Sequence, residues 1–419
     1  MRSSRRSRLR RIDFLASAAA SAVLANSAAA SAAATWIDLP MQNGRRPVVA
    51  YPQKRPLIVQ SSRPPILETP FDVFDSGELT PNDAFYVRWH EAGIPTSVDA
   101  ASYRLNVHGL VQKPLSLTLA QLQSEFEPVE IVAVNQCSGN SRGLFDPRVP
   151  GGEWANGGMG NARWKGARLK DILAKSGIAA GAKQISYHGL DHAVLPATPS
   201  FRKALDIDFA ADNPDIIVAY EMNGSALPLL NGFPARLVVP GWFATYWVKM
   251  LADIEVIDHV DDNFWMATAY RIPDTPNNSV TPVQTGYKTL PISRMRVRSF
   301  ITSVANGEFV SGLAPADPHY PLRVSAHIRG IAFDGGSGIR TVEFSSDGGK
   351  TWSPANLAPD LGKYSFRRWT ASWTTRAGSG THTLACRATA NSGDAQTTFT
   401  VWNPGGYLKN NIETYQVSV

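Results

Sequence analysis

Short runs of alternating hydrophobic and polar residues cover most of the chain, and they predict strands more often than helices. Between about residues 81 and 276, β-rich runs at 103–107 and 131–134 alternate with helical patterns at 117–126 and 169–176. Strands and short helices mixed in this order are typical of an α+β domain. The connections between them are long and rich in Gly and Pro, and such loops commonly carry binding sites.

From about residue 291 the pattern contains strands only. Runs at 322–328, 341–345 and 383–388 alternate in hydrophobicity, and turn signals separate them. Asp334-Gly335-Gly336 and Asp347-Gly348-Gly349 supply glycines for the positive φ angles that tight turns require. Several short strands at this spacing predict an immunoglobulin-like β-sandwich. The expected fold is therefore an α+β domain followed by an all-β sandwich.

Residues 35–80 differ from both domains because they are rich in proline and show little periodicity. This composition predicts an extended arm with little regular structure, wrapped around a domain. We therefore expect a targeting segment at 1–34, the arm at 35–80, the α+β domain at 81–288 and the sandwich at 289–419.

The first 34 residues have the features of an export signal. Six arginines crowd the first eleven positions, an apolar run covers residues 14–24, and small residues up to Ala34 offer cleavage sites. Arg10-Arg11 and the residues after them are similar to the bacterial twin-arginine signal, which exports folded proteins. A general secretory signal is the alternative. We expect a periplasmic protein without a membrane span, because the apolar run is too short to cross a bilayer.

The charge of the chain argues against a nucleic-acid partner. The formal net charge is +6, but without the six N-terminal arginines and Asp13 it falls to +1. Neutralising nucleic-acid phosphates requires a larger basic excess than that.

Cysteine usage gives one candidate metal ligand. The chain contains only Cys137 and Cys386, and it has neither a C-x-x-C-H haem-attachment motif nor Cys/His spacing typical of zinc sites. Cys137 follows an apolar run and precedes glycine, so we expect it at a strand-to-loop corner near Arg142. Thiolate is a soft ligand for transition metals, and one cysteine is enough when a cofactor supplies the other ligands. The alternative for Cys137 is a small buried hydrophobe, the role we expect for Cys386.

The same segment contains a formal match to the serine-hydrolase elbow G-x-S-x-G, at Gly139-Asn140-Ser141-Arg142-Gly143. That elbow leads from a strand directly into a helix. Here the proline- and glycine-rich residues 145–152 follow and exclude a helix, so the sequence argues against a serine hydrolase.

Two further groups of residues combine charge with apolar neighbours. In residues 85–90, a strand-like alternation puts Arg88 and His90 on one face and aromatic residues on the other. A solvated edge strand is the alternative for that run. Arg236 and Lys249 flank an apolar run, where they either bind phosphate or are ordinary surface charges.

These segments together resemble the sulfite oxidase family, from about Thr80 to the C-terminus. The resemblance rests on residues 80–90, on Gln136-Cys137-Ser138-Gly139-Asn140 with Arg142, on Ala162-Arg163-Trp164-Lys165-Gly166 and on residues 220–241. In the second domain, Ser346-Asp347-Gly348-Gly349-Lys350-Thr351-Trp352 and Trp402-Asn403-Pro404-Gly405-Gly406 resemble the family's dimerisation domain. The resemblance implies a molybdopterin-binding catalytic domain at 81–288 and a dimerisation domain at 289–419.

The resemblance also implies site residues. Cys137 would be the protein thiolate on molybdenum, Arg88, Arg142 and Tyr270 would form an oxyanion pocket, and Trp154 would lie on the substrate channel. The residues implied to hold the Mo-molybdopterin cofactor are Tyr86, Val87, Arg88, Trp89, His90, Asp191, Asn231, Arg236, Trp247, Val248 and Lys249. Asn231 departs from the family pattern, since histidine is common there.

The implied reaction is oxidation of sulfite to sulfate by oxygen-atom transfer, as in the bacterial periplasmic branch of the family. Because the chain has no haem-attachment motif, the electrons are expected to pass singly to a c-type cytochrome. That cytochrome is a separate protein or a stable subunit, so the expected assembly is a homodimer or a heterodimer.

Three alternatives remain open. Two of them lie within the family: a sulfane dehydrogenase subunit of a thiosulfate-oxidising complex, and a molybdenum-dependent reductase. The pair Arg88 and Arg142 favours a small oxyanion substrate over the reductase. The third alternative belongs to a different class of protein: an exported binding protein with no catalytic activity. Absence of bound metal would favour this alternative.

Overall fold

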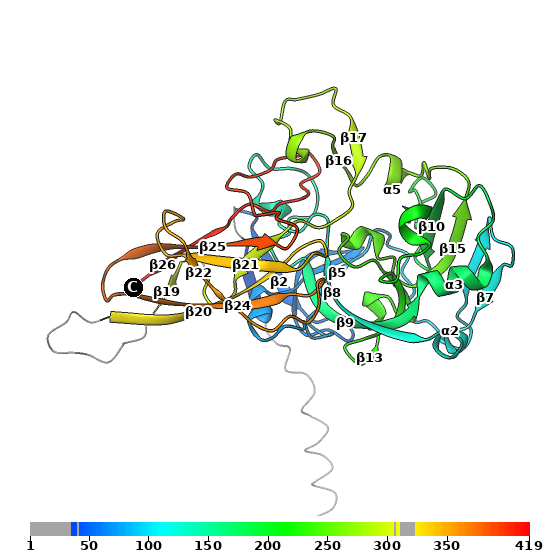
Figure 1. Cartoon of the computed structure of the whole chain (residues 1–419), viewed down its shortest axis with the longest axis horizontal. Helices are drawn as coiled ribbons and strands as arrows, with labels where there is room; N and C mark the ends of the chain where they lie inside the picture. Colours follow the sequence, from blue (N-terminus) through cyan, green and yellow to red (C-terminus); the bar gives the residue numbers. More distant parts are fainter. Residues whose placement is uncertain (1–34, 40–41, 306, 311–322) are drawn as a thin grey trace, which may run out of the picture.

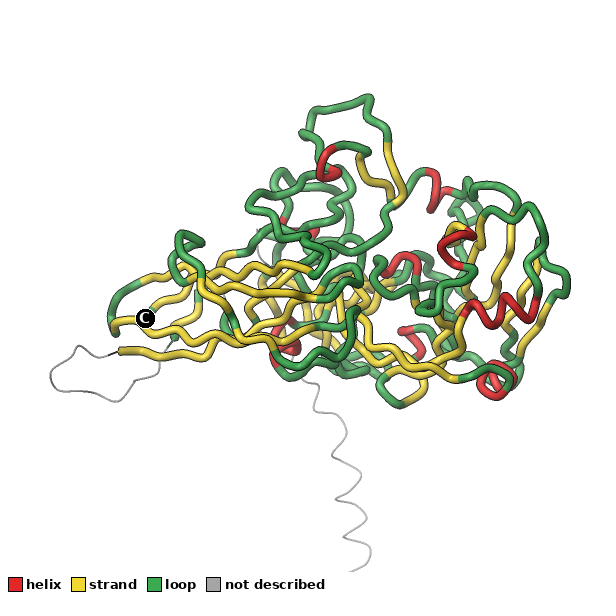
Figure 2. The backbone as a smooth tube through the Cα atoms, viewed as in Figure 1, coloured by secondary structure: helices red, strands yellow, loops and turns green. Residues whose placement is uncertain are grey.

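The computed structural model describes residues 35–39, 42–305, 307–310 and 323–419. The predicted export signal at residues 1–34 lies outside them. Strands dominate the described chain, and its helices are short (Figure 2). An α+β domain and a β-sandwich lie side by side along the longest axis (Figure 1), as the strand pattern predicted. No helix in these described ranges is long and apolar enough to cross a membrane.

The arm contains regular structure, so the prediction of little structure for residues 35–80 was wrong. It forms strands β1 (Thr35–Asp38), β2 (Arg45–Val49), β3 (Leu57–Ser62) and β4 (Pro65–Glu68) and the 3-10 helix η1 (Phe71–Asp75). These strands and β5 (Val87–Arg88) make a five-stranded sheet in the order β1-β2-β3-β4-β5. Pro65 is the first residue of β4, a position that proline tolerates in a strand. Pro47 lies opposite Trp36 of β1 but has no partner in β3, because β2 pairs with β3 only through Val48 and Val49.

Two sheets form the rest of the first domain. One has the order β11-β10-β15-β6-β7, and the other has the order β13-β12-β9-β8 with β14 paired to β12. Their strands are β6 (Leu105–Gly109), β7 (Leu115–Leu117), β8 (Pro128–Gln136), β9 (Met159–Arg168), β10 (Gln184–Gly189), β11 (Arg202–Asp206), β12 (Ile217–Met222), β13 (Ser225–Ala226), β14 (Arg236–Val238) and β15 (Leu251–Ile257).

The predicted helices at 117–126 and 169–176 are confirmed. They are α2 (Leu119–Ser124) and α3 (Leu169–Ser176), and two one-turn helices follow, α4 (Ile207–Ala210) and α5 (Phe264–Ala267). A capping box explains where α2 begins, because Thr118 and Gln121 each bond the other's backbone N–H. The 3-10 turns that matter for the site are η2 (Arg142–Leu144), η3 (Leu229–Asn231) and η4 (Ala244–Tyr246).

The second domain packs one sheet of order β18-β20-β24-β23 against another of order β19-β26-β25-β21-β22. The strands are β18 (Arg298–Ile301), β19 (Glu308–Phe309), β20 (Arg323–Phe333), β21 (Ile339–Ser345), β22 (Ser353–Pro354), β23 (Asn356–Leu357), β24 (Arg367–Arg376), β25 (Thr381–Ala390) and β26 (Thr414–Ser418). Their inner faces share one core, and Cys386 is part of it. The predicted core role of Cys386 is confirmed.

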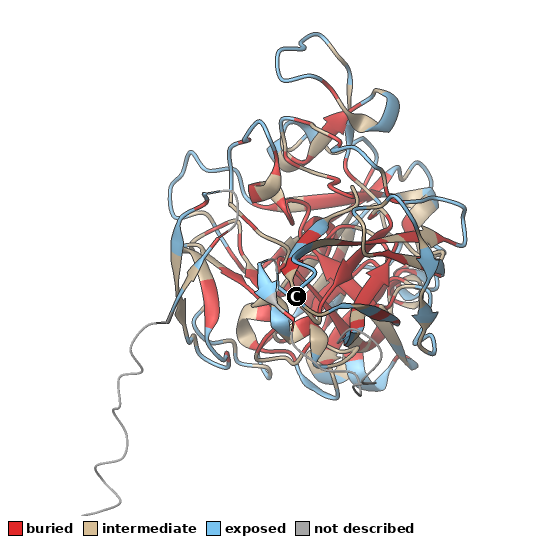
Figure 3. Ribbon diagram, turned by 90° about the vertical axis from the view of Figure 1, so that its left-hand side faces the viewer, coloured by how far each residue is buried: buried red, intermediate tan, exposed pale blue. Residues whose placement is uncertain are grey.

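The two domains are tied together along their boundary. The backbone N–H of Val134 in β8 donates to Tyr364 of the second domain, and Trp402 donates its indole N–H to the carbonyl of Pro147. Buried residues run through the interior of both domains (Figure 3). A hairpin of β16 (Arg271–Pro273) and β17 (Thr289–Pro291) projects from the body and carries mostly exposed residues at its tip.

Candidate active site

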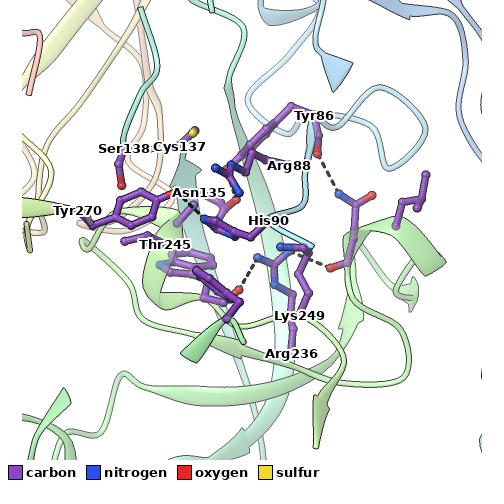
Figure 4. Close-up of a pocket in the computed structure, with 15 residues that line it drawn as sticks. Tyr86, Arg88, His90, Asn135, Cys137, Ser138, Arg236, Thr245, Lys249 and Tyr270 are labelled. Atoms are coloured by element: carbon purple, nitrogen blue, oxygen red, sulfur yellow. Dashed lines mark hydrogen bonds between the residues drawn. The ribbon is translucent and has the colours of Figure 1, made fainter. Parts of the chain in front are cut away.

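A cavity lies where β5, the end of β8, η3, β14 and the segment before β15 converge. Figure 4 shows the side chains that surround it. Its lining residues are Tyr86, Arg88, His90, Asn135, Cys137, Ser138, Phe201, Leu230, Asn231, Arg236, Ala244, Thr245, Trp247, Lys249 and Tyr270. Segments far apart in sequence therefore place a thiol, a phenol, an imidazole and several cationic groups around one space.

Cys137 stands at the corner where β8 ends, as its position after an apolar run predicted. Its backbone N–H donates to Gly158 at 2.9 Å, and its carbonyl accepts from Asn140 at 3.0 Å, which closes a tight turn. The thiol is free, buried, and lines the cavity. Among the described residues, no cluster of three or more His, Cys, Asp and Glu side chains could hold a metal ion. A metal at Cys137 would therefore need most of its ligands from a cofactor.

The alternation predicted for residues 85–90 is present, and it places charged or polar side chains on the cavity side and apolar ones on the opposite side. Val87 and Trp89 pack into a small apolar cluster with Leu67, whereas Arg88 and His90 face the cavity. The alternative of a solvated edge strand is wrong, because Val87 and Trp89 are each only 1% exposed. Val87 and Trp89 thus support the cavity from behind and do not line it.

His90 and Tyr270 form a hydrogen-bonded pair inside the cavity. Nε2 of His90 lies 2.5 Å from the hydroxyl oxygen of Tyr270, and the imidazole stacks on Phe201 with ring centroids 3.6 Å apart. Burial, with the charge of Arg88 beside it, holds the pKa of His90 well below its usual range. His90 is therefore neutral at pH 7 and can accept the proton of the phenol. Burial also raises the pKa of Tyr270, so its hydroxyl group is protonated at pH 7.

Arg236, which is buried, and Lys249, which is partly buried, form a basic wall of the cavity, so the alternative of ordinary surface charges is wrong for this pair. Arg236 donates to the carbonyl of Asn231 at 2.8 Å and to that of Trp247 at 3.2 Å. Burial lowers its pKa to about 10, and burial lowers the pKa of Lys249 to about 7. The ammonium of Lys249 lies over the ring of Trp89, 4.4 Å from its centroid. An anionic ligand would stabilise both charged forms.

The arm supplies one cation that the sequence patterns did not reveal. The ammonium of Lys54 donates to the carbonyls of Asn82 and Phe85, at 2.6 and 2.9 Å, and to the side-chain oxygen of Asn231. The amide nitrogen of Asn231 in turn donates to the carbonyl of Tyr86 at 3.1 Å. Lys54 thereby fixes the orientation of a cavity residue from outside the cavity.

Besides Val87 and Trp89, four residues implied by the family resemblance do not line the cavity. Arg142, in η2, donates its Nε proton to the carbonyl of Gly405 at 3.0 Å. Trp154 is buried, and its ring packs edge-on against Tyr86 with centroids 5.9 Å apart. Asp191 is buried beside Lys249, whose charge partly offsets the rise in its pKa on burial. The carbonyl of Val248 accepts from Leu237, so this residue belongs to the cavity's framework.

The serine of the hydrolase-like motif has a structural role. The hydroxyl of Ser141 donates to the side-chain oxygen of Asn156 at 2.5 Å and accepts from Arg298 at 2.9 Å. Neither partner is a base that could activate a nucleophile. The short turn η2 follows directly, in place of the helix that the hydrolase elbow requires.

Six polar atoms around the cavity are buried and have no hydrogen-bond partner among the described residues. They are Nη1 of Arg88, Nδ1 of His90, Nδ2 of Asn135, Oγ of Ser138, Nε of Arg236 and Oγ1 of Thr245. Buried polar groups are almost always hydrogen-bonded, so this concentration points to a ligand. Four of the six are N–H donors or amide groups, which suits a ligand that is anionic and rich in acceptors. The residues present therefore fit a phosphorylated pterin cofactor with a metal near Cys137.

Comparison with known proteins agrees with this chemistry. Residues 91–265 match the family described as Oxidoreductase molybdopterin binding domain, and residues 289–419 match Mo-co oxidoreductase dimerisation domain. Sulfite oxidase of Gallus gallus is 32% identical over 382 residues, 86% of this chain and 78% of that protein. Mitochondrial sulfite oxidase of Homo sapiens is 32% identical over 375 residues, but the matched region spans only 65% of its length.

A solved structure with the same architecture is the sulfane dehydrogenase SoxCD from Paracoccus pantotrophus. The two structures align with a TM-score of 0.70 and 25% sequence identity, over 85% of each chain. Fold and cavity thus define a molybdopterin-binding oxidoreductase with a C-terminal dimerisation domain. The chain belongs to the sulfite oxidase family, and its cofactor is molybdenum bound by molybdopterin.

Proposed function

We propose that this enzyme oxidises sulfite to sulfate and passes the electrons one at a time to a c-type cytochrome. The observation that carries the proposal is the cavity itself, which combines the thiol of Cys137 with the unpartnered guanidinium nitrogen of Arg88. A thiolate suits molybdenum, and a guanidinium suits a small oxyanion. In the overall reaction, sulfite gains one oxygen atom from water and releases two electrons and two protons.

The cofactor supplies the oxygen-atom transfer, and the chain's own residues would bind the anion and move protons. Cys137 would be the protein ligand of molybdenum, while Arg236, Lys249, Asn231 and Trp247 would hold the pterin. Arg88 would bind a sulfite oxygen through its fork of N–H donors, with Arg142 adding positive charge nearby. These donors would also stabilise the greater charge of sulfate as it forms.

Proton movement would run through Tyr270 and His90. The neutral imidazole would accept the proton of the phenol, and the phenol oxygen would take up a proton released at the reacting centre. Oxidation of sulfite releases protons within a buried cavity, so a base in hydrogen-bond contact with the site is required.

The cellular setting follows from the predicted export signal at residues 1–34. It supports a periplasmic enzyme exported after cofactor insertion, where c-type cytochromes are available as acceptors. The match to a dimerisation domain supports a dimer, either of two copies or with the cytochrome as a subunit.

Sulfane dehydrogenase is the second candidate. The observation that favours it is the likeness to SoxCD, which extends over 85% of both chains. In that case the cavity would receive a protein-bound sulfur group in place of free sulfite. Activity on free sulfite separates the two functions.

The test compares wild type, Cys137→Ser and the control Cys386→Ala, each purified from its own periplasm. We expect about one molybdenum per chain in wild type, with sulfite-dependent reduction of a c-type cytochrome that Cys137→Ser abolishes. Cys386 lies in the core of the second domain, so Cys386→Ala should keep both the metal and the activity. Molybdenum without sulfite activity would favour sulfane dehydrogenase, and absence of molybdenum would overturn the catalytic proposal.

A further inference from the structure

A loop of the second domain, residues 402–409, reaches into the first domain next to the cavity. Its Tyr407 stacks on Tyr270, with ring centroids 5.7 Å apart and ring planes 16° from parallel. The guanidinium carbon of Arg142 lies 5.2 Å from the centroid of the Tyr407 ring. Tyr407 therefore contacts both Tyr270 and Arg142, two of the three residues assigned to the oxyanion pocket.

The loop is built to hold Tyr407 in this place. The fully buried side chain of Asn403 donates to the carbonyl of Tyr407 at 2.8 Å and accepts from its N–H at 3.1 Å. The ring lies against Gly405, where a Cβ atom would stand 2.3 Å from a ring carbon. Only glycine leaves room for the ring at that position.

The same loop also holds Arg142. Its Nε proton is donated to the carbonyl of Gly405, and its guanidinium occupies space that Gly139 and Gly151 leave open. A Cβ at either glycine would lie within 2.7 Å of a guanidinium atom. The direction of the fork is thus set jointly by glycines of the first domain and by the loop of the second.

Tyr270 needs such support. Its φ angle is +59°, a left-handed conformation that is unfavourable for a residue with a bulky side chain. The hydrogen bond to His90 holds only the hydroxyl end of the ring. Burial raises the pKa of Tyr407, and the charge of Arg142 partly offsets that rise. The two tyrosines are joined by their stacked rings.

We infer that Tyr407 is a positioning residue, through which the second domain fixes the ring of Tyr270 and the fork of Arg142 for the anionic substrate. This inference rests on the function proposed above. It gives the second domain a part in the active site in addition to assembly. The chemical class served is a small tetrahedral or pyramidal oxyanion.

The experiment uses the full-length holoenzyme with three variants. Tyr407→Leu removes the stacked ring, Tyr407→Phe retains it, and Gly405→Ala displaces it by steric contact. The controls are Tyr364→Leu, which removes another second-domain tyrosine that contacts the first domain through Asp215, and Gly77→Ala, where a Cβ meets nothing within 4 Å. Each variant is examined for kcat and KM with sulfite and ferricyanide, for the pH profile of kcat, and for sulfate affinity by calorimetry.

We expect Tyr407→Leu and Gly405→Ala to lower kcat and sulfate affinity by about tenfold each and to move the pH profile, because misplaced groups lose effective concentration. Tyr407→Phe should restore both quantities to within about threefold, because it retains the ring stack. The controls should match wild type in kcat and sulfate affinity. Equal values for Tyr407→Leu and Tyr364→Leu would overturn the inference, as would a failure of Tyr407→Phe to rescue.

Sulfate binding separates this inference from the proposed function. If wild type binds sulfate without oxidising sulfite, the proposed function fails, and the sulfate affinities still decide the role of Tyr407. If wild type oxidises sulfite and Tyr407→Leu behaves as wild type, the inference alone fails. A wild type that neither binds sulfate nor oxidises sulfite overturns both.

Discussion

The hydroxyl of Tyr270 and Nε2 of His90 lie 2.5 Å apart in a cavity where Tyr270 is buried and His90 is partly buried. The imidazole is held from the other side by Phe201, which stacks on it. Since burial and the charge of Arg88 keep His90 neutral, the pair is arranged to pass a proton from phenol to imidazole. The other ring nitrogen, Nδ1, has no partner among the described residues and is free to donate to a bound cofactor.

Tyr270→Phe removes the phenol proton and should lower kcat for sulfite by about a hundredfold, the low end of the range for general acid–base catalysis. The KM should change much less, because the ring and its stack on Tyr407 remain. Steady-state kinetics with ferricyanide as acceptor measures both. The control is Tyr246→Phe, whose hydroxyl donates to the carbonyl of Ile292 outside the cavity. Equal kcat for the two variants would contradict the role of Tyr270.

The neutral state of His90 predicts a pH dependence. The pKa of His90 is lowered from its usual value, so protonation begins only well below pH 6.5. The kcat of wild type should therefore not fall between pH 8 and 6.5 through loss of this base. Stopped-flow reduction of the enzyme by sulfite across this range measures the step without the cytochrome. A fall in rate centred near pH 6.5 would contradict the assignment.

Arg88→Met should raise the KM for sulfite by about 10- to 100-fold, because a charge-assisted hydrogen bond to the anion is lost. Arg88→Lys should recover only part of the loss, since an ammonium keeps the charge but not the fork. The matched control is Arg163→Met, an arginine paired with Glu130 on the surface. Initial rates over a range of sulfite concentrations check all three variants, and an unchanged KM in Arg88→Met would exclude anion binding at Arg88.

Local sequence patterns predicted much of this framework. Strand β8 and the corner at Cys137 follow from an apolar run that meets glycine, and α2 follows from helical periodicity behind the Thr118 cap. The strands of the sandwich follow from alternation between turn glycines. In each case, neighbours within a few positions determine the conformation, so the signal is present in the sequence itself.

The contacts that sequence patterns missed join residues far apart in the chain. Lys54 bonds Asn231, 177 positions away, and Arg142 bonds Gly405, 263 positions away. Nothing in the proline-rich arm or in the last loop marks either contact. For the same reason the arm was expected to lack structure. Its sheet includes β5, which lies outside the arm and pairs with β4 through Ile66 and Arg88.

Arg298 and Glu413 form a nearly buried ion pair next to the loop that follows Cys137 (residues 137–141), with nitrogen and oxygen 2.7 Å apart. Arg298 also donates to Ser141, so the pair ties that loop to the second domain. Arg298→Met should destabilise the protein by about 3–5 kcal/mol, because it leaves the carboxylate buried without its partner. Thermal melting measures the loss. The double variant Arg298→Met/Glu413→Gln should recover part of it, and a double variant less stable than the single one would contradict this account.

Lys54 predicts that stability depends on pH in a defined direction. Burial lowers the pKa of its ammonium to about 7, whereas the unfolded chain should keep the usual lysine pKa of about 10.4. Between those values the unfolded chain binds a proton that the folded protein has released, so raising the pH favours folding. The stability of wild type relative to Lys54→Met should therefore increase from pH 7 to 9, by at most about 1.4 kcal/mol per pH unit.

Comparing wild type with Lys54→Met at each pH removes the contribution of other titrating groups. Melting temperatures at pH 6, 7.5 and 9 provide the measurement, and Lys175→Met is the control because Lys175 is partly exposed and paired with Glu125. The control's difference from wild type should stay constant across this range. A constant difference for Lys54→Met as well would mean that Lys54 remains charged in the folded protein. Its three oxygen partners, Asn82, Phe85 and Asn231, would then hold a full ammonium against the cost of burial.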